Sequence, residues 1–330
     1  MNFENFIEEI KKMVKEYLGG NIRIEEKTVL KNNGVKLTGI VIVEEGQNCV
    51  PNIYLNGYFE EFKSGRRMGD ILYEIARYYE EHKIVKQVNM DYFSDYKKMK
   101  DKICFRLINY NKNEELLKEI PHIPYLDLAI VFYCIVHNEN IGSGSILIRN
   151  EHLRNWNVDI REIQSVAFSN APKLLKGEIL PMEDVICKMM KNRMVREIER
   201  CIKDQMETKI CVTDEMIEPI IGEMMQKIYS EAKGPKMYVA SNENKNFGAS
   251  VILYDDFLKQ FANETGEDYF ILPSSIHEVI LIPVEDEDED VTQLREMVCD
   301  VNETELEREE ILSDSVYLYK RNSGIVTRIQ

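Results

Sequence analysis

The segment GEDYFILPSSIHEVILIP, residues 266–283, carries the clearest evidence of fold class in this chain. Two short apolar runs flank Pro273-Ser274-Ser275. Proline fixes its own φ and serine hydroxyls accept hydrogen bonds from nearby amides, so the tripeptide has the chemistry of a turn. Two apolar runs around a turn predict an antiparallel hairpin of buried strands.

The rest of the chain mixes strands and helices without a strict βαβ rhythm. Apolar residues at helical spacing predict helices, and alternation of apolar and polar residues predicts strands. Asn33-Gly34 tolerates positive φ and predicts a tight hairpin turn within residues 22–46. Helices are expected over 3–18, 57–101, 111–120, 151–156, 159–176, 256–265 and 291–301, and further strands over 52–55, 103–110, 126–136, 145–149, 236–242, 249–254 and 315–321. This pattern predicts an α+β fold with mixed, largely antiparallel sheets and packed helices.

One segment differs from the rest in composition and suggests how the chain is divided. Residues 178–233 are rich in Met, Lys, Arg and Glu and contain almost no aromatic residues, and Lys233-Gly234-Pro235 ends the segment. We therefore expect two parts joined by a helical connector: an N-terminal α+β domain over 1–177, the connector over 178–234, and a C-terminal α+β domain over 235–330.

Composition and charge bound the classes of function. The net charge of −16 disfavours binding to nucleic acid or to anionic membranes. The longest apolar run, 126–136, contains Asp127 and is about half the length of a membrane span, so it predicts a buried strand and no membrane association. The N-terminus is charged throughout and does not resemble a signal peptide. Seven cysteines without CxxC spacing predict reduced thiols in the cytoplasm, and no cofactor is expected.

Several phrases, spread over nearly the whole chain, together resemble one bacterial family. They are KNNGVKLTGIVI (31–42), PNIYLNGYFEEFKSG (51–65), YLDLAIVFYCIV (125–136), AFSNAPKLL (167–175), GASVILYDDFLKQFA (248–262), ILPSSIHEVILIP (271–283) and EEILSDSVYLYKR (309–321). The chain resembles the family numbered 5688 among domains of unknown function, seen mainly in anaerobic gut Firmicutes. Its C-terminal strand, helix and hairpin more distantly resemble the uncharacterised family numbered 1444. Neither resemblance implies an activity, a ligand or a catalytic residue.

The turn at 273–278 is also the best candidate for chemistry. Ser275, His277 and Glu278 offer a nucleophile, a base and an acid, which a serine hydrolase needs within hydrogen-bond reach. On a strand, Ser275 and His277 would share a face and Glu278 would point the other way, and the GxSxG elbow is absent. These features favour a structural or ligand-contacting role.

Metal and phosphate sites find little support in the sequence. His277-Glu278 begins an HExxH motif, but Leu281 stands where the second histidine would be, so no metal site is expected. The acidic run 285–290 lacks the glycine of a calcium loop and predicts a solvated loop. Residues 142–145, GSGS, predict a hairpin loop rather than a phosphate-binding loop.

The connector carries the one concentrated basic surface. Arg193, Arg196 and Arg200 are spaced to share a helix face, which either pairs with neighbouring glutamates or binds a partner together with an adaptable apolar side that includes Met189.

These observations favour a non-catalytic binding or regulatory module, which could have a protein partner. The alternative is a hydrolase or transferase with a site around 273–278, in which Ser313 and Asp314 would join Ser275, His277 and Glu278. A nucleic-acid-associated protein acting through the connector is the least favoured class because of the net charge.

Overall fold

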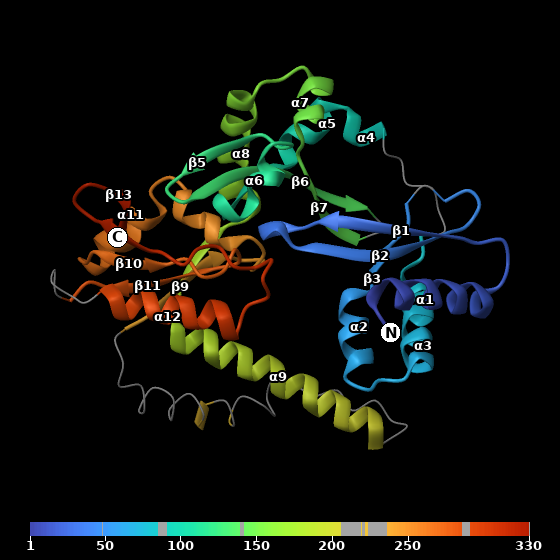
Figure 1. Ribbon diagram of the computed structural model, residues 1–330. Coiled ribbons are helices and arrows are strands. Elements are labelled where there is room, and N and C mark those ends of the chain that lie inside the picture. Colours follow the sequence, from blue (N-terminus) through green and yellow to red (C-terminus); the bar gives the residue numbers. More distant parts are fainter. Residues whose placement is uncertain are drawn as a thin grey trace. The chain divides into compact units, whose positions relative to one another are not determined.

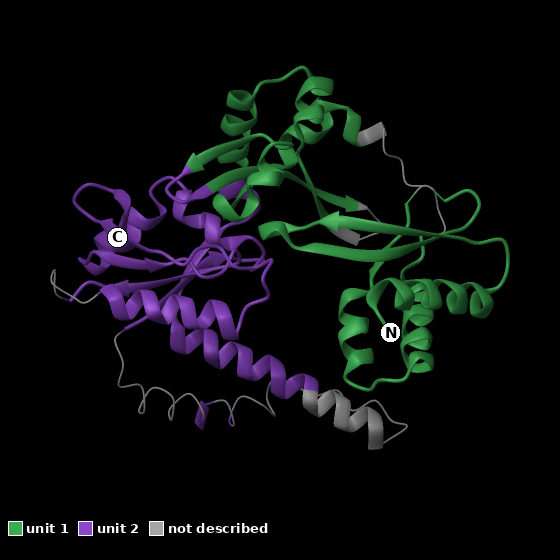
Figure 2. Ribbon diagram, in the orientation of Figure 1, with its two compact units in different colours: residues 1–124, 129–170 green, residues 125–128, 171–330 purple. Residues whose placement is uncertain are grey.

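A computed structural model describes residues 1–47, 49–84, 91–138, 142–205, 219, 222–223, 236–285 and 291–329. The chain is an α+β protein with antiparallel sheets, as the sequence predicts (Figure 1). It divides into two compact units, one of residues 1–124 and 129–170 and the other of residues 125–128 and 171–330 (Figure 2).

Unit 1 begins with a three-stranded sheet and three helices that pack on it (Figure 1). The antiparallel sheet has the order β1-β2-β3, and Asn33, with φ of 58°, turns the chain between its first two strands. Their apolar faces share a core that includes Phe6, Ile10, Ile42 and Ile75. The elements are α1 (Phe3–Leu18), β1 (Arg23–Leu30), β2 (Lys36–Val43), β3 (Asn52–Tyr54), α2 (Asn56–Lys63) and α3 (Met68–His82).

The second half of unit 1 is built around another antiparallel hairpin, β6 (Leu128–Asn138) with β7 (Gly142–Leu147), which confirms that the strands predicted over 126–136 and 145–149 pair. The hairpin loop predicted at 142–145 is wrong: these four residues begin β7, because their backbone pairs with β6 from Gly142 opposite Asn138 to Ser145 opposite Ile135. Strands β4 (Ile103–Asn109) and β5 (His122–Tyr125) flank β6 in the order β4-β6-β5. The helices of this half are α4 (Asp91–Ser94), α5 (Tyr96–Met99), α6 (Glu114–Leu117), α7 (Asn150–Trp156) and α8 (Ile160–Leu174).

Unit 2 contains a six-stranded sheet among its described residues, with the order β13-β12-β10-β11-β9-β8 and antiparallel pairing throughout. Helix α12 packs Leu294 and Val298 against Phe270, Ile282 and Val316 of the sheet (Figure 1). The elements are β8 (Gly177–Pro181), α9 (Met182–Gln205), β9 (Tyr238–Asn242), α11 (Phe257–Thr265), β10 (Tyr269–Leu272), β11 (Val279–Pro283), α12 (Val291–Thr304), β12 (Val316–Lys320) and β13 (Ile325–Ile329).

The hairpin predicted from residues 266–283 is confirmed, because β10 and β11 pair with Leu272 opposite Ile280. The strand predicted over 249–254 is wrong: Gly248–Leu253 form a 3₁₀ helix. An apolar run of this length suits either a strand or a buried helix, and here Gly248 to Ile252 are all buried.

The segment expected to be a helical connector includes a strand. Residues Gly177–Pro181 form β8, which pairs with β9 at one edge of the sheet and ends in a proline. An edge strand tolerates proline because one side of its backbone needs no sheet partner. Helix α9 follows, as the composition predicts. Strand β13, which the sequence did not predict, closes the other edge of the sheet.

Candidate functional site

The loop between β10 and β11 holds Ser275, His277 and Glu278, and it lies against a second segment of unit 2. Ile276 N donates to Glu310 O at 2.9 Å, Leu312 N to Ser274 O at 2.7 Å, and Ser313 N to Pro273 O at 2.9 Å. Residues 273–278 and 310–313 therefore lie side by side. The sequence analysis proposed that Ser313 and Asp314 join the turn, and in the structure the backbone of Ser313 contacts it through Pro273 O.

His277 is held through its main chain and its ring. Its carbonyl accepts from Ser241 Oγ at 2.8 Å, and its backbone N–H donates to Ser275 Oγ at 3.0 Å. In the ring, Nδ1 accepts from Phe247 N at 3.3 Å, and Nε2 lies 3.6 Å from Glu310 Oε1. The Phe247 ring also lies nearly parallel to the imidazole, with centroids 5.9 Å apart. The residue thus ties the loop to two other segments of unit 2.

These contacts fix the tautomer of the neutral imidazole. Because Phe247 N–H donates to Nδ1, the lone pair of Nδ1 is occupied and the ring proton must be on Nε2, facing Glu310. A general base needs a free lone pair to accept a proton. In this arrangement neither ring nitrogen of His277 offers one.

Ser275 is positioned as a turn residue. Its side chain is buried, and its hydroxyl oxygen accepts from the backbone of His277 two residues later, which is a local turn contact. Within the described residues, no hydrogen bond joins the Ser275 hydroxyl to the imidazole, and none joins Glu278 to His277. The three residues are neighbours in the sequence, but the structure does not link their side chains as a catalytic triad.

The segment that presents Phe247 carries backbone strain, which the sequence analysis did not predict. Lys245 and Phe247 have φ of 50° and 55°, a region that residues with a side chain rarely adopt. Buried Asn242 supports this segment, since its side chain donates to Asn246 O and accepts from Asn246 N. The asparagine-rich sequence at 242–246 was the available signal, because asparagine forms such local turns.

Truncating His277 is expected to weaken the fold. His277→Ala removes the Nδ1 atom that accepts from Phe247 N and the ring stacked on Phe247, so we expect the free energy of unfolding to fall by about 1–2 kcal/mol. Glu310→Gln keeps the shape and removes a partly exposed charge, so its effect should stay below about 0.5 kcal/mol. Urea unfolding of the two variants measures both values, and an unchanged stability for His277→Ala would contradict the structural role.

A buried-hydroxyl cluster lies beyond Ser313 and consists of Ser313, Ser315, Tyr317 and Asp127. Ser313 Oγ and Ser315 Oγ donate to Asp127 Oδ2 at 2.6 and 3.0 Å, and Tyr317 OH donates to Asp127 Oδ1 at 2.6 Å. Asp127 belongs to residues 125–128, which the structure assigns to unit 2. The hydroxyl of Ser313 is therefore committed to Asp127 and is not available at the 273–278 turn.

The electrostatics of this cluster favour the charged carboxylate. Burial alone would raise the pKa of Asp127, but the hydrogen bonds from Ser313, Tyr317 and Ser315 outweigh it and hold the pKa below its ordinary value. Burial and the neighbouring Asp127 carboxylate raise the pKa of Tyr317. Both groups thus stay in the forms that make the short hydrogen bond, and Asp127 acts as a fixed acceptor rather than as a proton carrier at neutral pH.

The other candidate residues lie on α9. The Met189 side chain is 63% exposed, and Ile186 and Met190 are also exposed, which gives this helix an apolar surface. Arg193 and Arg196 are exposed, and Arg196 Nε donates to Asn192 O within the same helix. The Arg200 side chain lies outside the described residues, as do residues 286–290 of the acidic run.

Comparisons with known proteins identify one match. The model of a family of unknown function, DUF5688, matches residues 3–321. No curated protein and no solved structure matches the chain. Across the described ranges, no group of three or more His, Cys, Asp or Glu side chains is placed to hold a metal ion, and no helix there is long and apolar enough to cross a membrane.

Proposed function

Since the chain belongs to the DUF5688 family, whose function is unknown, we propose from the geometry that the protein is a non-catalytic binding or regulatory protein of the cytoplasm. The observation that carries this proposal is the bonding of His277. Its Nδ1 accepts from Phe247 N and its Nε2 bears the proton, so it cannot activate the Ser275 hydroxyl.

Two further features support the proposal. The exposed Ile186, Met189 and Met190 of α9 form an apolar surface that includes two flexible methionines, and exposed methionines are typical of adaptable binding surfaces. The described cysteines are free, and Cys104 and Cys134 are fully buried, which is the usage expected in a reducing compartment.

Reaction with a fluorophosphonate tests the absence of an activated serine. An activated serine oxygen displaces fluoride from the phosphorus and becomes phosphonylated, whereas an unactivated serine does not react. We expect intact-mass analysis of the native protein to show no adduct, under conditions that fully label a known serine hydrolase. An adduct mapped to Ser275 and absent from His277→Gln would overturn the proposal in favour of a hydrolase or transferase.

A further inference from the structure

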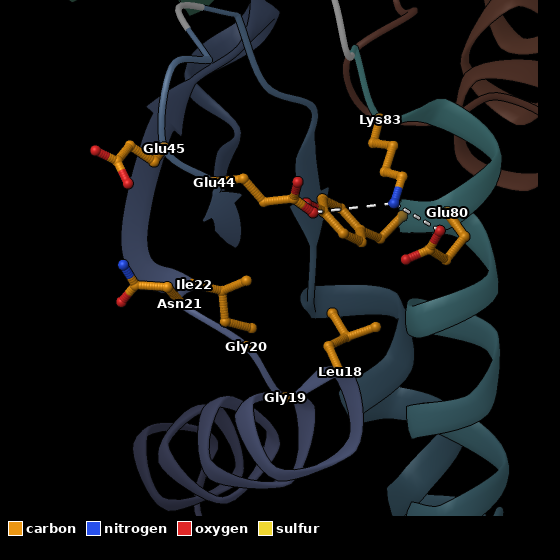
Figure 3. Close-up of a pocket in the computed structure, with 10 residues that line it drawn as sticks. Leu18, Gly19, Gly20, Asn21, Ile22, Glu44, Glu45, Glu80 and Lys83 are labelled. Atoms are coloured by element: carbon orange, nitrogen blue, oxygen red, sulfur yellow. Dashed lines mark hydrogen bonds and ion pairs between the residues drawn. The ribbon is translucent and has the colours of Figure 1, made fainter.

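Unit 1 contains a pocket of about 460 Å³, which lies far from the 273–278 turn in sequence and is made by residues of that unit alone (Figure 3). Its volume falls within the range of roughly 300–1,000 Å³ that small-molecule sites occupy. The residues that line it are Leu18, Gly19, Gly20, Asn21, Ile22, Glu44, Glu45, Tyr79, Glu80 and Lys83.

Two helices end at this pocket. Helix α1 ends at Leu18, and α3 ends at His82, so the last turns of both helices contribute to the wall. The final carbonyl groups of a helix lack partners within the helix and carry the negative end of its dipole. Both ends therefore favour positive charge in the space between them.

The ionised side chains add to this preference. Lys83 Nζ lies 2.8 Å from Glu80 Oε2 and 3.9 Å from Glu44 Oε1, so the lysine is shared between two carboxylates. Tyr79 OH donates to Glu44 Oε1 at 2.7 Å and fixes that carboxylate in place. Two carboxylates, those of Glu44 and Glu80, therefore stand beside one ammonium, and this part of the wall retains an excess of negative charge.

The pocket also has an apolar wall. Figure 3 shows Leu18 and Ile22 pointing into the space that Glu44 and Lys83 face, whereas the side chains of Glu45 and Asn21 point away from it. An occupant therefore meets hydrocarbon on one side and carboxylate on the other. A bare metal ion makes no use of the hydrocarbon, and a purely apolar molecule makes no use of the excess negative charge.

We propose that this pocket binds a small organic cation, a primary ammonium group on a short alkyl chain. The ammonium group takes a position beside the Glu44 and Glu80 carboxylates, which Lys83 now shares, and the alkyl chain covers Leu18 and Ile22. This assignment rests on the proposed binding function and names the class of ligand. An organic anion is excluded because the positive charge of Lys83 is already balanced by two carboxylates.

Calorimetric titration of the full chain with three molecules of the same shape tests the charge preference. Pentylamine, pentan-1-ol and pentanoate each contain five carbon atoms in an unbranched chain, and their terminal groups are positive, neutral and negative at pH 7. We expect pentylamine to bind, with an affinity that falls as salt is added because the carboxylates are partly exposed. The alcohol and the carboxylate should bind at least about tenfold more weakly, and binding of pentanoate as tight as that of pentylamine would overturn the proposal.

Three variants locate the binding in this pocket. Glu44→Gln keeps an acceptor for Tyr79 and removes a charge, so the affinity for pentylamine should fall about fivefold. Lys83→Gln removes the competing ammonium, so the affinity should rise several-fold; a fall would overturn the assignment. The matched control is Glu9→Gln on the exposed face of α1, which removes the same charge outside the pocket and should leave the affinity unchanged.

The outcomes separate the two proposals. No heat of binding with pentylamine, from protein with unchanged circular dichroism, would reject the ligand class and leave the non-catalytic function standing. A fluorophosphonate adduct at Ser275 would reject the non-catalytic function whatever the amine titration shows.

Discussion

Asp127→Ala is expected to lower the free energy of unfolding of unit 2 by about 3–5 kcal/mol, because it removes the common acceptor of three hydroxyl groups. Ser313 and Tyr317 are fully buried, so their hydroxyls cannot turn to water once the carboxylate is gone. Hydrogen bonds to a charged acceptor are stronger than neutral ones, and an unpartnered buried hydroxyl costs free energy in its own right.

Urea unfolding followed by circular dichroism measures the loss of stability, and hydrogen exchange of residues 313–320 locates it in unit 2. Asp101→Ala is the matched control, since Asp101 is an exposed aspartate and its loss should change stability by less than about 0.5 kcal/mol. Equal stabilities for the two variants would show that the Asp127 cluster does not hold the fold.

The same cluster gives the stability of the protein a pH dependence at acid pH. The pKa of Asp127 is lower in the folded protein than its unfolded value of about 3.9, so the unfolded state takes up the proton first as the pH falls. The contribution of Asp127 is therefore complete above the unfolded pKa and is lost as the pH falls through the folded pKa. The difference in stability between the wild type and Asp127→Asn should be constant from about pH 7 to pH 5 and shrink below about pH 4; a constant difference down to pH 3 would contradict the assignment.

Local patterns in the sequence predicted the elements whose structure depends on neighbours in the chain. The hairpin of residues 266–283 formed as predicted because its turn and both strands lie within eighteen residues of each other. The apolar run at 249–254 predicts a strand where the structure has the 3₁₀ helix Gly248–Leu253, because the run has no periodicity that separates a strand from a buried helix. The run is buried on all sides, and that burial depends on the rest of unit 2 rather than on the local sequence.

The candidate site was predictable only in part for the same reason. The sequence indicates that Ser275 and His277 sit in a turn, but the partner that fixes the ring of His277 is Phe247, thirty residues earlier. Asp127 and its hydroxyl donors are separated by 186 to 190 residues. Asp127 is conspicuous in the sequence as a charge next to an apolar run, but only the folded chain shows what surrounds it.

Gly248→Ala is expected to destabilise unit 2 strongly, because residue 248 lies where three segments of that unit meet. A Cβ at this position would overlap Ser241 Oγ and His277 O and would lie 2.7 Å from Asn242 N. Two of these three atoms belong to the backbone, and the hydroxyl of Ser241 is held by its bond to His277 O, so the collision cannot be relieved by rotating a side chain. We expect a loss of about 3 kcal/mol or more, seen as a lower urea midpoint or as failure to accumulate folded protein.

Gly69→Ala is the control: the added methyl group meets no atom within 4 Å, and alanine favours helix α3, so stability should rise by about 0.5–1 kcal/mol. If Gly248→Ala were as stable as Gly69→Ala, the Ser241, Phe247 and His277 segments could not be packed as tightly as the structure has them, and the assignment of the His277 tautomer would fall with that packing.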